Sequence, residues 1–172
     1  GVDPASIYFT SGATESNNVV LRGVVNYAND RGRIPNIVTQ PTEHSAILVP
    51  LRELARRGRC TVTLVPVGPS GIVDPDDVKR AIRPDTALVT VMGANNETGA
   101  IQPIQAIADV AHSRGVPMHS DLCQSFARVP LRGFDGASGS AHKIHGPTST
   151  GFVSLSPALR ARITPPELGG SQ

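Results

Sequence analysis

The repeated alternation of short β-rich segments with amphipathic helical segments is the feature that most constrains how this chain can fold. Residues 86–92 form an almost continuous apolar run, which is typical of a strand buried on both faces of a parallel sheet. Pro103 then begins a segment with apolar residues at helical spacing, and the chain returns through Gly115 to a strand that ends at Asp121. These units predict an α/β fold with a mostly parallel sheet and helices on both faces.

Further strands and helices continue the same alternation. Strands are expected over residues 7–10, 36–39, 60–66 and 151–155. Helices are expected after Gly12, after His44 and after Asp74, where Pro75 occupies the first helical position. The last strand follows Lys143 after a turn that is too short for a crossover helix, so it should run antiparallel to its neighbour and make the sheet mixed.

The composition limits the class of protein. With 172 residues, of which 39% are hydrophobic, the chain suits one soluble domain with a sizeable core. No apolar run approaches the length of a membrane span and no signal-peptide pattern opens the chain, so we expect a cytoplasmic protein with no membrane partner. A net charge of +2 and only 3% aromatic residues argue against direct nucleic-acid binding. Cys60 and Cys123 make neither a disulfide framework nor a zinc motif, so no metal is expected.

Lys143 is the first candidate for chemistry. The chain has two lysines against fourteen arginines, and Lys143 lies among histidines and small polar residues in the segment 140–147. An amine can form a Schiff base, which a guanidinium cannot. Asp121, at the end of an apolar strand, could keep a pyridinium nitrogen protonated, and this pair is the minimal equipment of a pyridoxal 5′-phosphate (PLP) site. Taken alone, the pair is better explained as a solvated lysine and a helix-capping aspartate.

Three other segments reach the same edge of the predicted sheet. Residues 11–16 join a strand to a helix, so the free N–H groups of the first turn and the Thr14 hydroxyl could bind a phosphate, although an ordinary capped helix has the same pattern. His44 follows the carboxyl end of a strand, where ligands gather in open α/β sheets. There it could stack on an aromatic ring, transfer protons, or simply be solvated. Residues 95–99 follow the apolar strand to this edge as well.

Together these segments resemble a known family. In order and spacing, the cysteine desulfurases are matched by Ser11-Gly12-Ala13-Thr14-Glu15-Ser16, Thr42-Glu43-His44, Asn95-Asn96-Glu97-Thr98-Gly99, Asp121-Leu122-Cys123-Gln124 and Ser140-Ala141-His142-Lys143. That family belongs to the class V aminotransferase group of fold type I PLP enzymes. The resemblance covers nearly the whole chain. It implies an aspartate aminotransferase-like architecture in which residues 1–172 are part of the large, PLP-binding domain, without the N-terminal segment and the smaller C-terminal domain.

The resemblance also implies roles for single residues. Lys143 would bind the cofactor covalently and, with His44, would be catalytic. His44 would stack on the cofactor ring, and Asp121 would pair with the ring nitrogen. Gln124 would donate a hydrogen bond to the phenolic oxygen, and Asn96 would lie near that oxygen and the substrate carboxylate. The phosphate would be held by Ala13, Thr14, Ser140 and His142.

The activity implied is removal of sulfur from L-cysteine, which gives L-alanine and an enzyme persulfide for sulfur transfer, as in iron–sulfur cluster assembly. A homodimer and a sulfur-acceptor protein are the implied partners. Ala141, Cys123 and Thr148-Ser149 depart from the family pattern by small changes. The family's cysteine-bearing loop and substrate-binding arginine have no counterpart in these residues. Because Cys60 and Cys123 are both expected to be buried, this fragment alone should be inactive.

Several alternatives remain at this point. A selenocysteine lyase shares the fold, and a truncated homologue could serve as a non-catalytic binding module. His119, Asp121 and Cys123 have the period-2 spacing of a zinc site on one strand face, but no fourth ligand is evident. Residues 140–143 also match the S-x-x-K motif of serine β-lactamases, without the S-D-N and K-T-G motifs that accompany it.

Overall fold

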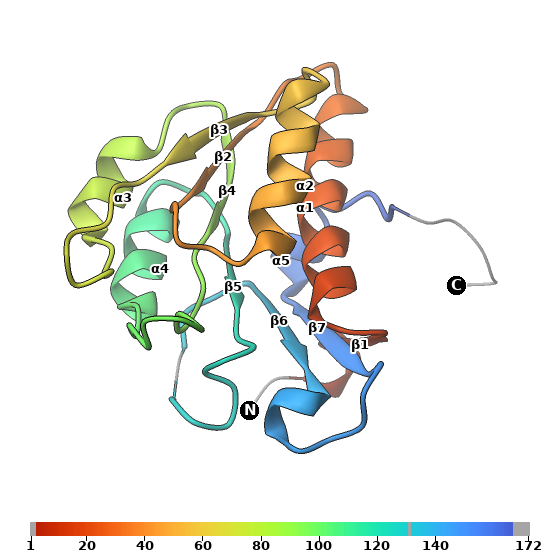
Figure 1. Ribbon diagram of the computed structural model, residues 1–172. Coiled ribbons are helices and arrows are strands. Elements are labelled where there is room, and N and C mark those ends of the chain that lie inside the picture. The colour runs from red at the N-terminus through yellow and green to blue at the C-terminus, as the bar shows by residue number, and fades with distance from the viewer. Residues whose placement is uncertain (1–2, 131, 167–172) are drawn as a thin grey trace.

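The computed structural model describes residues 3–130 and 132–166, which contain one seven-stranded sheet with helices on both faces (Figure 1). In chain order the elements are η1 Pro4–Ser6, β1 Ile7–Thr10, α1 Ala13–Asn29, β2 Asn36–Thr39, α2 Ser45–Arg56, β3 Thr61–Leu64, α3 Pro75–Ala81, β4 Thr86–Thr90, α4 Ile104–Ser113, β5 Met118–Asp121, β6 Gly136–Ser140, η2 Ala141–Ile144, β7 Gly151–Leu155 and α5 Pro157–Arg160, with η marking 3-10 helices. The strand order is β1-β7-β6-β5-β4-β2-β3. Strand β7 is antiparallel to both neighbours and the other pairs are parallel, which confirms the predicted mixed sheet.

Two apolar layers hold the helices to the sheet. Helices α1, α2 and α5 cover one face, and α3 and α4 cover part of the other (Figure 1). The side chains of β2 alternate accordingly, because Ile37 belongs to the first layer and Val38 to the second. Leu88 and Val89 of β4 divide in the same way. Within the described part of the chain, no helix combines the length and the apolar character needed to cross a membrane.

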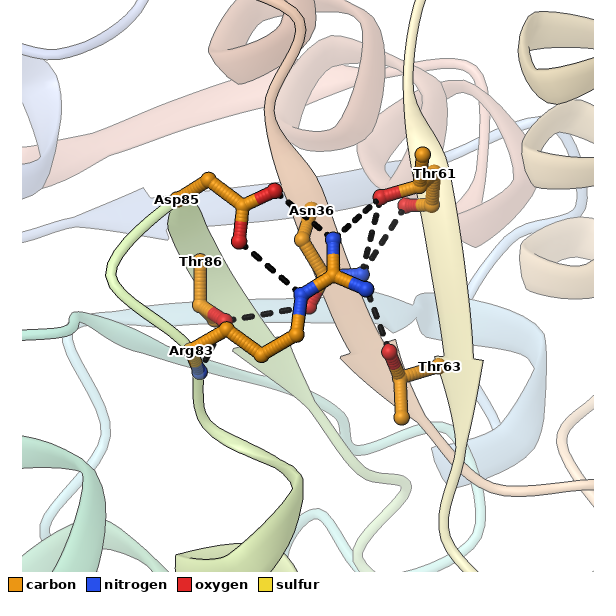
Figure 2. Close-up of polar contacts among 6 residues, drawn as sticks. All are labelled: Asn36, Thr61, Thr63, Arg83, Asp85 and Thr86. Atoms are coloured by element: carbon orange, nitrogen blue, oxygen red, sulfur yellow. Dashed lines mark hydrogen bonds and ion pairs between the residues drawn. The ribbon is translucent and has the colours of Figure 1, made fainter.

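A buried amide fixes the register at the amino ends of three strands. Figure 2 shows Asn36 of β2 between Thr61 and Thr63 of β3 and Thr86 of β4. Its Nδ2 donates to the Thr63 and Thr61 hydroxyls at 3.0 and 3.1 Å, and its Oδ1 accepts from the Thr86 hydroxyl at 3.0 Å. Arg83 adds a hydrogen bond to the Thr61 hydroxyl at 2.9 Å. Slipping any of these strands by one residue would leave Asn36 buried without partners, so the polar cluster specifies the pairing.

Strand β6 was not predicted from the sequence. Its residues, Gly-Ala-Ser-Gly-Ser, have low intrinsic preference for strands, yet all five are buried. A Cβ atom at Gly139 would lie 2.5 Å from the Phe152 ring of β7, and one at Gly136 would lie 2.7 Å from Leu159 of α5. The small residues are therefore a packing requirement. The expected strands at 60–66 and 86–92 are shorter in the structure, as β3 and β4.

Gly151 allows β7 to touch the turn that precedes α1. A Cβ atom there would lie 2.5 Å from the Cα of Gly12 and 2.8 Å from the carbonyl oxygen of Gly139. Both of these are backbone atoms, which cannot move aside as a flexible side chain can. The glycine thus sets how closely the start of α1 approaches the carboxyl edge of the sheet.

Replacing Gly151 with alanine should destabilise the protein by about 1–3 kcal/mol, the usual cost of overpacking a rigid site. Gly68→Ala is the matched control, since a Cβ atom at Gly68 meets nothing within 4 Å. Urea unfolding of both variants and the wild type measures the difference. Equal unfolding midpoints for all three proteins would show that the contact at Gly151 is easily relieved.

Candidate active site

The structure brings all nine predicted site residues around one cavity of about 230 Å³. They are Ala13, Thr14, His44, Asn96, Asp121, Gln124, Ser140, His142 and Lys143. The cavity lies at the carboxyl ends of the strands, where Asp121 ends β5 and Ser140 ends β6. Four further lining residues were not predicted to contact a ligand, namely Ala46, Met92, Ala94 and Cys123. A larger hollow of about 710 Å³ beside β1 and β7 is mostly apolar, and the described residues that line it include no amine and no carboxylate.

Asp121 forms the floor of the cavity and is held through both carboxylate oxygens. Its side chain is buried, with the residue 5% exposed. Oδ1 accepts from the backbone N–H of Cys123 at 2.9 Å, and Oδ2 accepts from Nδ2 of Asn17 at 2.7 Å. Each carboxylate oxygen can accept more than one hydrogen bond, so the group can still face a protonated ligand atom.

The start of α1 provides the anion-binding end of the cavity. Gly12 is the N-cap residue, so the cap position itself has no side chain that could accept from the first turn. The N–H of Ala13 instead donates to the Ser140 hydroxyl at 2.8 Å, which ties α1 to the end of β6. Thr14 lies exposed at the rim. The remaining N–H groups of this first turn have no intrahelical acceptor, and the dipole of the 17-residue helix favours negative charge at this position.

His44 and the Asn95-Asn96 pair form another part of the wall. Nδ1 of His44 accepts from the N–H of Ala46 at 3.1 Å, so the ring caps α2 and a neutral ring carries its proton on Nε2. Asn95 is buried and donates to the carbonyl oxygen of Thr42 at 2.8 Å, which connects the loops after β2 and β4. Asn96 is exposed and lines the cavity. Asn95 thus holds the loop in place, and Asn96 lines the cavity.

Lys143 lies on the short helix η2, directly after β6. It is half-buried and lines the cavity, while its carbonyl oxygen accepts from Nη2 of Arg128 at 2.6 Å. His145 caps η2 in the left-handed conformation, with φ of 65°. His142 is exposed on the same short helix, and Gln124 is half-buried just after β5. The backbone of the lysine loop is therefore held by Arg128, from the segment that follows β5.

Glu43 is a buried acid next to His44, and no role was predicted for it from the sequence. Oε1 accepts from the N–H of Met92 at 2.6 Å and from Nε2 of Gln40 at 2.9 Å. Oε2 is buried and has no hydrogen-bond partner in the part of the chain that the structure describes. Burial raises the pKa of the carboxyl to about 8, so the group is mostly neutral at pH 7. It fastens the loop that carries His44 to the end of β4.

His119 lies beneath α1 and is fully buried. Nδ1 is 2.9 Å from the Thr90 hydroxyl, and Nε2 is 2.9 Å from the Ser138 hydroxyl. Burial lowers the pKa of the imidazole to about 4. Both ring nitrogens are occupied and β5 ends before Cys123, so the zinc alternative lacks its geometry. In residues 3–130 and 132–166, no three His, Cys, Asp or Glu side chains are grouped to hold a metal ion.

The two cysteines have different positions. Cys60 is buried in the apolar layer under α2, as expected, and burial raises the pKa of its thiol to about 11. Cys123 was expected in the core, but it is half-buried and lines the cavity, because the strand and its alternation end at Asp121. Burial and the nearby charge of Asp121 raise the pKa of its thiol to about 12. Both thiols are therefore protonated near neutral pH and are weak nucleophiles.

The chemistry of these residues fits one cofactor class. An amine, a carboxylate anchored by two N–H donors and an uncapped helix start surround one cavity at the carboxyl edge of an α/β sheet. This arrangement defines the cofactor-binding domain of fold type I PLP enzymes. The aminotransferase class-V family matches residues 1–172, and the chain belongs to that family. PLP, predicted from the sequence, is the cofactor of this family.

Known relatives agree with this assignment. The cysteine desulfurase IscS of Rickettsia felis is 39% identical over 176 aligned residues, which include the whole of this chain and 42% of that protein. The structure of SspA in complex with cysteine superposes with a TM-score of 0.92 at 34% identity, and DndA from Streptomyces lividans with 0.91 at 37% identity. Each structure is matched over 50% of its length by all of this chain. The chain thus spans about half the length of the relatives it matches.

The buried side chains of Glu43 and His119 predict opposite effects of pH on the stability of the fold. The carboxyl of Glu43 has a folded pKa of about 8 against 4.5 when unfolded, so the stability it contributes falls as pH rises between these values. The imidazole of His119 has a folded pKa of about 4 against 6.5, so stability is lost as pH falls through that range. Between pH 6.5 and 8, Glu43 is therefore the one of these two groups that makes the free energy of unfolding depend on pH.

In that window the free energy of unfolding should fall by about 2 kcal/mol, since each pH unit contributes about 1.4 kcal/mol for one proton. Glu43→Gln should remove most of this slope, because a neutral amide keeps the acceptor for Met92 and has no proton to release. Glu97→Gln, at an exposed carboxylate, is the matched control and should retain it. Urea unfolding at several pH values measures the slope, and an unchanged slope in Glu43→Gln would contradict the assignment.

Proposed function

We propose that the protein is a PLP-dependent cysteine desulfurase that converts L-cysteine to L-alanine and passes on the sulfur. The observation that carries this proposal is the meeting of all nine expected residues around one cavity, from five separate segments of the chain. The similarity to cysteine desulfurase IscS and to SspA, whose structure contains cysteine, supports the substrate.

In this proposal each group of residues that lines the cavity binds a different part of the cofactor or substrate. Lys143 attaches the cofactor through its amine, and Asp121 keeps a proton on the ring nitrogen. The bound cofactor supplies an electron sink for the charge that develops on the substrate. His44 stacks on the ring with an orientation fixed by its hydrogen bond from Ala46, while Gln124 contacts the phenolic oxygen. Asn96 lies at the rim, near that oxygen and the substrate carboxylate. The phosphate is bound by Ala13, Thr14, Ser140 and His142.

The sulfur-accepting thiolate comes from outside the described residues. Both described thiols have a pKa raised by burial, to about 11 for Cys60 and about 12 for Cys123. A nucleophile must also leave the cavity with its persulfide, and Cys123 is fixed between the Asp121 floor and Ser140. The proposal therefore includes a mobile cysteine elsewhere in the protein. It also includes a homodimeric assembly, a sulfur-acceptor protein and action in the cytoplasm.

Lys143→Ala should abolish the visible absorption band of covalently attached PLP. Lys79→Ala is the matched control, because Lys79 is the only other lysine of the chain and is exposed on α3. Titration of each purified protein with PLP, followed by absorbance and by mass spectrometry after borohydride reduction, measures the attachment. A reduced adduct that persists in Lys143→Ala would contradict the assignment.

The full-length protein should release alanine from L-cysteine and carry a persulfide on a cysteine other than Cys60 or Cys123. Cys123→Ala should keep most of this activity, because the protonated, fixed thiol takes no part in sulfur transfer. Alanine release and persulfide mapping by mass spectrometry measure both points. A persulfide on Cys123, or loss of alanine release in Cys123→Ala with PLP still bound, would overturn this part of the proposal.

A further inference from the structure

Asn17 connects α1 directly to the floor of the cavity. It lies in the second turn of α1 and is fully buried. Its Nδ2 donates to Oδ2 of Asp121 at 2.7 Å, across 104 positions of sequence. The other oxygen of Asp121 accepts from the backbone N–H of Cys123, so Asn17 supplies a side-chain N–H donor to the second oxygen of this carboxylate.

Packing alone does not explain an asparagine at this position. The buried neighbours on the same face of α1 include Val20, Leu21 and Val24, which belong to the apolar layer. The Oδ1 atom of Asn17 is buried and has no hydrogen-bond partner among residues 3–130 and 132–166, which is costly for a polar group. A carboxylate has no proton to donate, so the amide must turn its nitrogen to Asp121 and leave this oxygen unsatisfied. The hydrogen bond to Asp121 offsets the cost of this unpaired oxygen.

We infer that Asn17 is a positioning residue for the cofactor, acting through Asp121. This inference rests on the proposed function, in which Asp121 faces the ring nitrogen. The Cys123 N–H alone would leave the carboxylate free to turn about its side-chain torsions. The second donor fixes the plane of the carboxylate and compensates part of its negative charge in a buried place. Asn17 also couples the phosphate-binding start of α1 to the ring-binding floor, because it lies on the same helix as the first and donates to Asp121 in the second.

Asn17→Ala should weaken PLP binding about tenfold or more, as expected for loss of one hydrogen bond to a charged group. Asn18→Ala is the matched control, since Asn18 is the next residue of α1 and its side-chain hydrogen bonds to described residues stay within that helix, to Thr14 and Arg22. Spectral titration of the apoprotein with PLP gives the affinity. The ¹⁵N NMR shift of ring-labelled PLP reports the protonation of the ring nitrogen, which should change in Asn17→Ala and not in Asn18→Ala.

Asn17→Asp gives a second test that depends on pH. Two carboxyl groups at this separation share a proton at low pH, and that proton restores a donor to Asp121; at high pH both ionise and repel. Relative to the wild type at the same pH, the affinity of Asn17→Asp for PLP should be close to normal near pH 6 and at least tenfold weaker near pH 9. This series decides the question even where Asn17→Ala does not fold.

The outcomes separate the two proposals. A wild-type protein that does not attach PLP at Lys143 refutes the proposed function. A wild type that attaches PLP normally, with Asn17→Ala equal to Asn18→Ala in affinity and ¹⁵N shift, refutes the role of Asn17 alone. An affinity of Asn17→Asp that stays at a constant ratio to the wild type from pH 6 to pH 9 refutes it as well.

Discussion

The hydrogen bond from the Ala13 N–H to the Ser140 hydroxyl is the contact on which the rest of the site depends. It joins the first turn of α1 to the end of β6, which are separated by 127 positions of sequence. Gly151 permits this approach, because any side chain there would collide with the backbone of Gly12. Once the start of α1 lies against β6, Lys143 on the following turn lines the cavity and Asn17 on the helix reaches the carboxylate of Asp121.

The two ends of the parallel strands use buried polar groups differently. At the amino ends, Asn36 satisfies its amide with threonine hydroxyls on both neighbouring strands, and the result is a fixed register (Figure 2). At the carboxyl ends, Glu43 and Asn17 each keep one oxygen without a partner. Buried polar atoms near the carboxyl ends thus have fewer of their hydrogen bonds formed than Asn36 has at the amino ends. This is typical of a region selected for binding and not for stability alone.

Burial also decides the charge of four titratable groups, three near the site and one, Cys60, in the apolar layer. It raises the pKa of Glu43 and of both thiols, and it lowers the pKa of His119, so all four are neutral or nearly so around pH 7. Asp121 is buried as well, and its carboxyl oxygens accept hydrogen bonds from two N–H donors. This pattern leaves one anchored carboxylate facing the cavity, as pairing with a protonated ring nitrogen requires.

The sequence by itself determined the α/β class and the antiparallel β7, because apolar periodicity and the length of a turn are local signals. Through the resemblance of five short motifs to a known family, it also indicated nine of the residues that line the cavity. It did not determine β6, whose glycines and serines have no strand preference and are explained only by Phe152 and Leu159 lying over them. Nor did it place Cys123 at the cavity or give roles to Asn17 and Glu43. Only the tertiary structure decided these, since a buried amide or acid is defined by partners distant in sequence, and no local pattern records that contact.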